Sequence, residues 1–113
     1  MVTWFKANRS SDSDFGQIPL DAINIHIYVG DASNVLASTF GISPESADVR
    51  GILEEFVAYR DSLMPGIELW LSEFGYDTND NSPISVPTIG NNDNYEVQGQ
   101  WICLLYTSPS PRD

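Results

Sequence analysis

The residue best suited to chemistry is Glu73, which stands near the end of an apolar stretch of the chain. Residues 67–74 are rich in Leu, Ile, Trp and Phe, and Gly, Asp, Thr and Asn follow within a few positions. This pattern predicts a buried strand that ends in a loop. A carboxylate at that point is where enzymes built from alternating strands and helices keep catalytic groups. The other interpretation is a strand-end glutamate that is exposed or caps the loop.

Strand parity predicts which way Glu73 points. It puts Glu73 on the face of Leu69 and Leu71, whereas Trp70 and Ser72 face the other way. A carboxylate that ends an inward apolar row is poorly solvated, so hydrogen bonds or charges must offset its desolvation.

A second group of polar residues lies on the strand predicted at residues 21–29, where Asn24, His26 and Tyr28 alternate with aliphatic residues. The alternation fits a half-exposed antiparallel strand, or a barrel strand whose polar residues turn inward. The polar set has no Lys, Glu or Arg, which favours the barrel strand. In a parallel pair, His26 and Tyr28 would lie beside Glu73, and the Tyr28 hydroxyl could hold the carboxylate ionised and aimed. His26 could do the same, bind substrate hydroxyls, or be a satisfied core residue.

The segment between these strands has the pattern of a helix. Residues 30–42 form a connection with a short helix near 35–40, and Ser43 is the predicted N-cap, with Pro44 at the first helical position. A core-facing stripe follows at helical spacing, and Pro65-Gly66 ends the helix. The stripe consists of Val49, Ile52, Leu53, Phe56, Val57, Arg60 and Leu63. A strand, a helix and a strand in this order predict a parallel crossover.

The flanking segments are less regular. Residues 1–9 have the pattern of the last turns of a helix, and a polar loop follows to residue 17. Residues 79–94 form an unusually long polar connection, which predicts a functional loop over a site. A helix is expected to start near Asp93 or Asn94 and to reach Ile102. Of the aromatic residues nearby, Tyr76 is a candidate for stacking on a sugar ring, whereas Phe74 and Trp101 fit core packing.

We expect no metal site and no cofactor. The run of residues 77–82 is similar to a calcium loop, but Ser82 and Thr88 stand where the glycine and the glutamate of such a loop belong. Turn chemistry accounts for these residues. The single cysteine, Cys103, excludes an intrachain disulfide and a cysteine metal cluster.

The composition of the chain limits the classes of molecule that it could bind. The 113 residues carry a net charge of −11 with five Lys plus Arg, which disfavours nucleic acid and anionic membranes. This acidity suits a neutral partner such as a polysaccharide or oligosaccharide. No apolar run approaches the length of a membrane span, and the first residues lack the layout of a signal peptide. The localisation is therefore open; a secreted or periplasmic parent protein would carry its signal upstream.

The last eleven residues differ from the rest of the chain. Residues 103–113 resemble a translated sequencing-library adapter, and their Thr-Ser-Pro-Ser-Pro run interrupts the helical pattern. The alternative is a natural proline-rich tail. We therefore expect a natural segment at residues 1–102, cut off in mid-helix, and a non-native tail at 103–113, which is set aside for reasoning about the fold.

Together these motifs resemble part of a retaining glycoside hydrolase of the large cellulase-like clan. Residues 21–28 are similar to the sixth strand of its (β/α)₈ barrel, which often carries a His-x-Tyr pair. Residues 69–77 are similar to the seventh strand, where the nucleophilic glutamate stands in a Glu-Phe-Gly setting. The resemblance covers residues 1–102 and implies an α/β fold, a partial TIM barrel of two parallel strands with flanking helices, truncated at both ends.

The resemblance also implies roles for these residues. Glu73 would be the nucleophile of a double displacement on β-linked glycans, Tyr28 would orient it, and His26 would support the site. Asn24 and Tyr76 would contact substrate. The clan's acid/base glutamate follows an asparagine on the fourth strand, and no Asn-Glu pair occurs in this sequence. That region would lie upstream of Met1, so we expect the fragment alone to be inactive.

Two other interpretations stay open. One is a non-catalytic carbohydrate-binding or cell-surface protein with barrel-like strands, which a parent protein without an acidic residue on strand four would favour. The other is a small independent α/β domain in which Glu73 is structural. That domain should fold cooperatively, whereas a barrel fragment should expose strand edges and aggregate.

Overall fold

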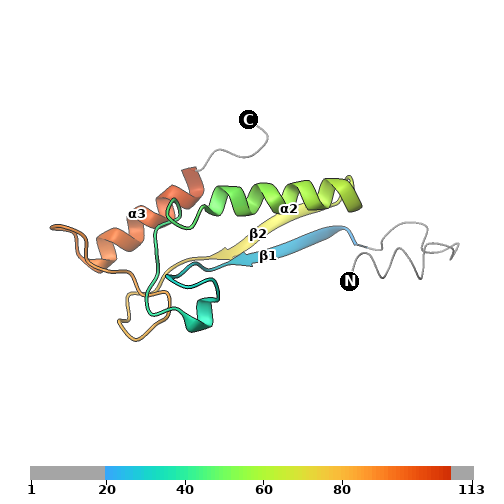
Figure 1. Cartoon of the computed structure of the whole chain (residues 1–113). Coiled ribbons are helices and arrows are strands. Elements are labelled where there is room, and N and C mark those ends of the chain that lie inside the picture. Colours follow the sequence, from blue (N-terminus) through green and yellow to red (C-terminus); the bar gives the residue numbers. More distant parts are fainter. Residues whose placement is uncertain (1–19, 108–113) are drawn as a thin grey trace, which may run out of the picture.

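A computed structural model describes residues 20–107. Its elements are β1 (Ala22–Ile27), the short 3₁₀ helix η1 (Val35–Ala37), α2 (Val49–Leu63), β2 (Glu68–Phe74) and α3 (Asn94–Thr107). The two strands pair in parallel, so this part of the chain has a mixed α/β fold. α2 lies along one face of the two-stranded sheet (Figure 1). None of the helices described is long and apolar enough to cross a membrane.

The predicted strand–helix–strand order is confirmed, because β1 and β2 run parallel on either side of α2 in the sequence. Ile23 pairs with Leu69 and Ile25 with Leu71, so these aliphatic residues form one face. Ile25, Ile27 and Val49 are buried between the sheet and the helix. This layer is the first of two core clusters.

The second core cluster lies beyond the carboxyl ends of the strands. It consists of Tyr76, Val86, Val97 and Trp101, all buried. The rings of Tyr76 and Trp101 meet edge to face at a centroid distance of 4.9 Å. The prediction that Trp101 packs in the core is confirmed. α3 therefore covers the loop after β2, as Figure 1 shows.

The predicted start of the central helix is wrong. Ser43 Oγ accepts from the Ser46 backbone N–H, but it caps only a separate turn over residues 44–48. Asp48 then adopts a left-handed conformation, with φ of 49°, and its side chain accepts from Gly51 N as the N-cap of α2. The left-handed residue breaks the helical path, because continuous helix needs right-handed dihedrals throughout.

α3 begins where the sequence predicts. Asp93 Oδ1 accepts from the Glu96 N–H, and Glu96 Oε2 accepts from the Asp93 N–H, which is a capping box. The helix continues to Thr107, so it includes the first five residues of the predicted adapter segment. The predictions for residues 1–19 and 108–113 lie outside the described residues.

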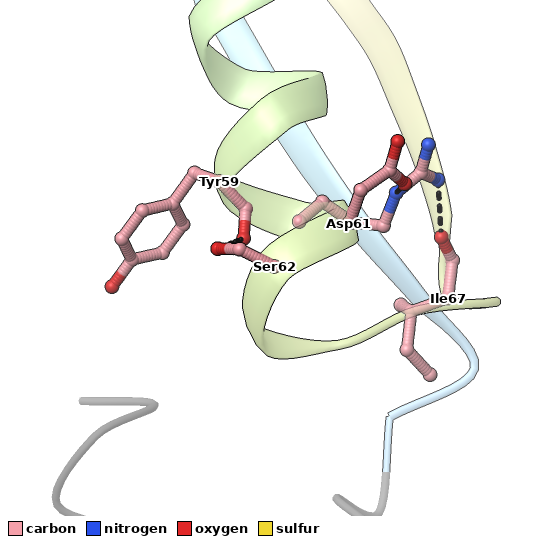
Figure 2. Close-up of polar contacts among 5 residues, drawn as sticks. Tyr59, Asp61, Ser62 and Ile67 are labelled. Carbon is pink, nitrogen blue, oxygen red and sulfur yellow. Dashed lines mark hydrogen bonds and ion pairs between the residues drawn. The ribbon is translucent and has the colours of Figure 1, made fainter.

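The stripe predicted on α2 faces the sheet through most of its length. Val49 and Arg60 are buried, whereas Phe56 is 41% exposed at the edge of the stripe. Arg60 Nη1 donates to the carbonyl oxygen of Ile67 at 2.6 Å, and Nε donates to Asp61 at 2.6 Å. Figure 2 shows the bond to Ile67, which ties the last turn of α2 to the entry of β2.

Arg60→Met should lower the free energy of unfolding by about 1–3 kcal/mol, because the Ile67 carbonyl and Asp61 lose their buried donor. Arg50→Met is the matched control. Arg50 bonds Glu54 on the exposed side of the same helix, and such pairs contribute about 0.3–0.5 kcal/mol. Urea titration followed by far-ultraviolet circular dichroism measures both. Equal losses for the two variants would contradict this account of Arg60.

Candidate active site

A β-bulge at Ser72 determines the direction of Glu73. Ile25 pairs with Leu71, but the next residue of β1, His26, pairs with Glu73, so Ser72 is an extra residue. The extra residue shifts the alternation by one position. Glu73 therefore lies on the face of Asn24, His26 and Trp70, away from α2. The parity prediction, which grouped Glu73 with Leu69 and Leu71, is wrong for this reason.

Two side chains of the β1 segment meet the Glu73 carboxylate. The Tyr28 hydroxyl donates to Oε2 at 3.1 Å. His26 Nδ1 lies 3.2 Å from the same oxygen. Tyr28 donates to Oε2, His26 makes a close contact with the same oxygen, and within residues 20–107 we find no donor to Oε1. The carboxylate is thus fixed by one oxygen and presents the other.

The site is open to solvent on this face. The side chains of His26 and Glu73 are 45% and 54% exposed, and Tyr28 is 40% exposed. The predicted poor solvation of Glu73 is therefore wrong, because the bulge turns the carboxylate out of the apolar layer. The hydrogen bond from Tyr28 and the contact with His26 orient the carboxylate rather than compensate for burial.

The pKa of Tyr28 is raised above the usual value for a tyrosine. Its hydrogen bond to Glu73 raises the pKa of the phenol, with slight desolvation and the negative charge of Glu73 acting in the same direction. A phenol that donates to a carboxylate loses that bond on ionisation, so the neutral form is favoured. Tyr28 therefore remains a donor across the neutral pH range.

The two residues predicted to contact substrate lie in different places. Asn24 is exposed beside His26, with Nδ2 3.4 Å from Nε2 of the imidazole. Tyr76 is 7% exposed, and its hydroxyl donates to the carbonyl of Ile42 at 2.9 Å. Burial raises the pKa of Tyr76. The structure brings Asn24 to Glu73 through His26 and keeps Tyr76 in the core.

The loops after the two strands are joined to each other, which holds the strand ends in place. Gly41 N donates to Ser85 O at 2.8 Å, and the Tyr76–Ile42 bond lies next to it. A Cβ at Gly41 would lie 2.9 Å from the Ile84 carbonyl oxygen, so this close approach requires glycine. Gln98 Nε2 donates to Tyr76 O at 2.6 Å and ties α3 to the same junction.

Sequence reasoning missed Trp70 as a member of this face. Trp70 pairs with Asn24, is 58% exposed, and donates from its indole nitrogen to Glu68 Oε2 at 2.7 Å. Strand parity correctly puts Trp70 on the face away from α2. It does not predict the bulge that brings Glu73 to the same face. The open face thus combines aromatic and polar side chains.

A pocket of about 480 Å³ lies next to this face, at the end of β1. Its walls come from His26 and Tyr28, from the connection at residues 29–35, and from α2, which contributes Ile52 and Phe56. One wall is therefore polar and the other apolar. The pocket thus extends from the end of β1 to α2, and Glu73 is not among the residues that line it.

The calcium-like run forms turns in the structure. Asp77 Oδ1 accepts from Asn79 N, and Asn79 Oδ1 accepts from Asn81 N. Across residues 20–107, no three His, Cys, Asp or Glu side chains gather so as to hold a metal ion.

Comparison of the chain with protein-family models, curated proteins and solved structures gives no match.

Glu73→Gln should lower the pKa of Tyr28 toward its usual value of 10, because the phenol then donates to a neutral amide. NMR titration of Cζ-labelled tyrosine measures the pKa, and Tyr28→Phe assigns the signal. Because the pKa of Tyr28 is raised in the folded state, this group stabilises the protein at pH values below the pKa of Tyr28 in the unfolded chain. That contribution to stability is lost as the pH rises through the pKa of Tyr28 in the folded state.

Glu54→Gln is the control. Glu54 pairs with Arg50 on α2, so this substitution removes the same charge at a distant position. A Tyr28 signal that titrates alike in the wild type and in Glu73→Gln would show that the Tyr28–Glu73 bond is absent in solution.

Proposed function

We propose that this chain is part of a retaining glycoside hydrolase of the cellulase-like clan, which cleaves β-linked glycans with Glu73 as the nucleophile. One observation carries the proposal. A carboxylate at the carboxyl end of a parallel strand receives Tyr28 and His26, both from the neighbouring strand segment, on one oxygen. The resemblance of both strand motifs to that clan supports the same assignment.

The chemistry needs a carboxylate that is ionised, aimed and accessible. In the first step Oε1 of Glu73 attacks the anomeric carbon, the glycosidic bond breaks, and a general acid protonates the leaving oxygen. In the second step the same group deprotonates a water molecule, which attacks the anomeric carbon and releases Glu73. Tyr28 donates to Oε2 and His26 contacts the same oxygen, which leaves Oε1 available for the first step.

The general acid/base is not a carboxylate of this face. Glu68 is five positions before Glu73, and at about 3.3 Å per residue the two lie on the order of 15 Å apart. Retaining enzymes place their two carboxyl groups about 5–5.5 Å apart. Asp31, in the neighbouring loop, accepts from Thr39, and these bonds lower its pKa, which disfavours a proton donor. We therefore assign the acid/base to another part of the protein.

The sheet itself supports a partial (β/α)₈ barrel. Parallel strands occur almost only in sheets with both faces covered. Within residues 20–107 the two parallel strands pair only with each other, and Trp70 and Tyr28 are exposed on the face away from α2. Six further strands would close a barrel around this face and would bring the acid/base to Glu73.

In the longer protein, an activated 2-deoxy-2-fluoro glycoside should form a stable covalent adduct on Glu73, because the fluorine slows release of the glycosyl-enzyme. Mass spectrometry of peptides identifies the labelled residue. Glu73→Gln should abolish labelling and lower kcat by roughly 10³-fold or more. Glu68→Gln is the matched control and should still be labelled. A label on another carboxylate would refute the assignment.

A second candidate is a non-catalytic carbohydrate-binding protein. The observation that favours it is the exposure of two aromatic rings, Trp70 at 58% and Tyr28 at 40%, on one side of the sheet. Sugar rings stack on such faces, and stacking needs no carboxylate pair. This function keeps the neutral glycan partner and removes the need for an acid/base.

Trp70→Ala separates the two candidates. A binding protein should lose affinity for β-linked oligosaccharides by about 10-fold or more, equivalent to ~1.4 kcal/mol, as measured by calorimetry. Tyr95→Ala, which removes a 69% exposed ring from α3, should leave binding unchanged. Binding to the chain alone that depends on Trp70, with no fluoroglycoside adduct in the longer protein, would favour the binding protein over the hydrolase.

A further inference from the structure

Asn24, His26 and Glu73 form a continuous row of polar contacts across the open face of the sheet. Asn24 Nδ2 lies 3.4 Å from His26 Nε2, and His26 Nδ1 lies 3.2 Å from Glu73 Oε2. The imidazole therefore contacts one partner through each ring nitrogen. Because only one proton is present on a neutral imidazole, the partners together decide which nitrogen carries it.

Both contacts require the same tautomer. An amide nitrogen is a donor, so His26 Nε2 must offer its lone pair to Asn24. An ionised carboxylate accepts only, so a proton on His26 Nδ1 suits the 3.2 Å contact with Glu73 Oε2. The two ends of the row therefore favour the same tautomer.

We propose that Asn24 is a positioning residue that holds His26 in its Nδ1-protonated tautomer, so that the imidazole donates to Oε2 of Glu73. This inference rests on the proposed function for the meaning of that bond, but the tautomer itself is a property of this chain. Asn24 thus acts through His26. The sequence resemblance gives it a different role, which is contact with a substrate.

The energetics separate this role from a structural one. Asn24 and His26 are both exposed, and Asn24 faces away from the aliphatic layer of Ile23 and Ile25. A hydrogen bond between exposed side chains contributes little to folding, because water replaces either partner. The loss of Asn24 should therefore change the position of the His26 proton while leaving the fold intact.

The chain contains a single histidine, so its ring nitrogens can be observed without overlap. We would record long-range ¹⁵N–¹H correlation spectra of the uniformly labelled chain at alkaline pH, where imidazole is neutral. Nε2 couples to both ring carbon-bound protons and Nδ1 to one, which assigns the two signals. The proposal expects a pyrrole-type shift for Nδ1 and a pyridine-type shift for Nε2.

Two substitutions at Asn24 test the cause. Asn24→Ala removes one of the two groups that favour the proton on Nδ1, so the two nitrogen shifts should move toward each other. Asn24→Asp has the same shape but places an acceptor at Nε2, so the Nε2 signal should move to the pyrrole type. Asn91→Asp, at an exposed loop position before α3, makes the same charge change and should leave both signals as in the wild type.

Each outcome decides the proposal. A wild-type spectrum with the proton on Nε2, or on both nitrogens, would overturn it, because the Asn24 amide would then be reversed. Unchanged shifts in Asn24→Ala would overturn the role of Asn24. Neither result depends on hydrolysis. A failed fluoroglycoside label on Glu73 with the expected tautomer would refute the enzyme assignment and leave the Asn24–His26 contact in place.

Discussion

The chemistry of the open face depends on the one residue that is left out of the pairing between the strands. Ser72 opposes no residue of β1, so the alternation of side chains in β2 shifts by one position after Leu71. Without this bulge, Glu73 would point into the apolar layer beneath α2, where an unpaired carboxylate is strongly disfavoured. With it, Glu73 meets His26 and Tyr28, and Phe74 returns to the helix side, where its ring contacts Tyr106.

The bulge determines the direction of the Glu73 side chain only if the ends of β1 and β2 keep fixed positions relative to each other. The loops after β1 and β2 are joined by the Gly41–Ser85 backbone bond and by the buried Tyr76 hydroxyl. α3 closes the junction through Gln98 and through Trp101, which packs on Tyr76. The long polar loop is thus partly a core element, and it stabilises the position from which Tyr28 reaches the carboxylate.

The elements could be predicted from the sequence because their periodicities are strong. The alternating residues of β1 indicate a strand, and the stripe from Val49 to Leu63 indicates a helix. The details that failed depend on single residues without such a pattern. Strict alternation of side chains along a strand assumes that there is no bulge, so it predicts Glu73 on the face of Leu69 and Leu71 instead of the open face. The left-handed Asp48 and the burial of Tyr76 arise from tertiary packing, which local sequence does not encode.

The most direct test of the glycoside hydrolase account is to recover the longer reading frame from the source DNA, by amplification outward from the codons for residues 20–102. The account predicts further strand–helix units on both sides of this segment, with an Asn-Glu pair at the end of an upstream strand. A frame that begins at Met1 and ends at Asp113 would contradict it. Glu73 would then be a surface carboxylate of a small α/β protein, and its bonds to Tyr28 and His26 would be structural.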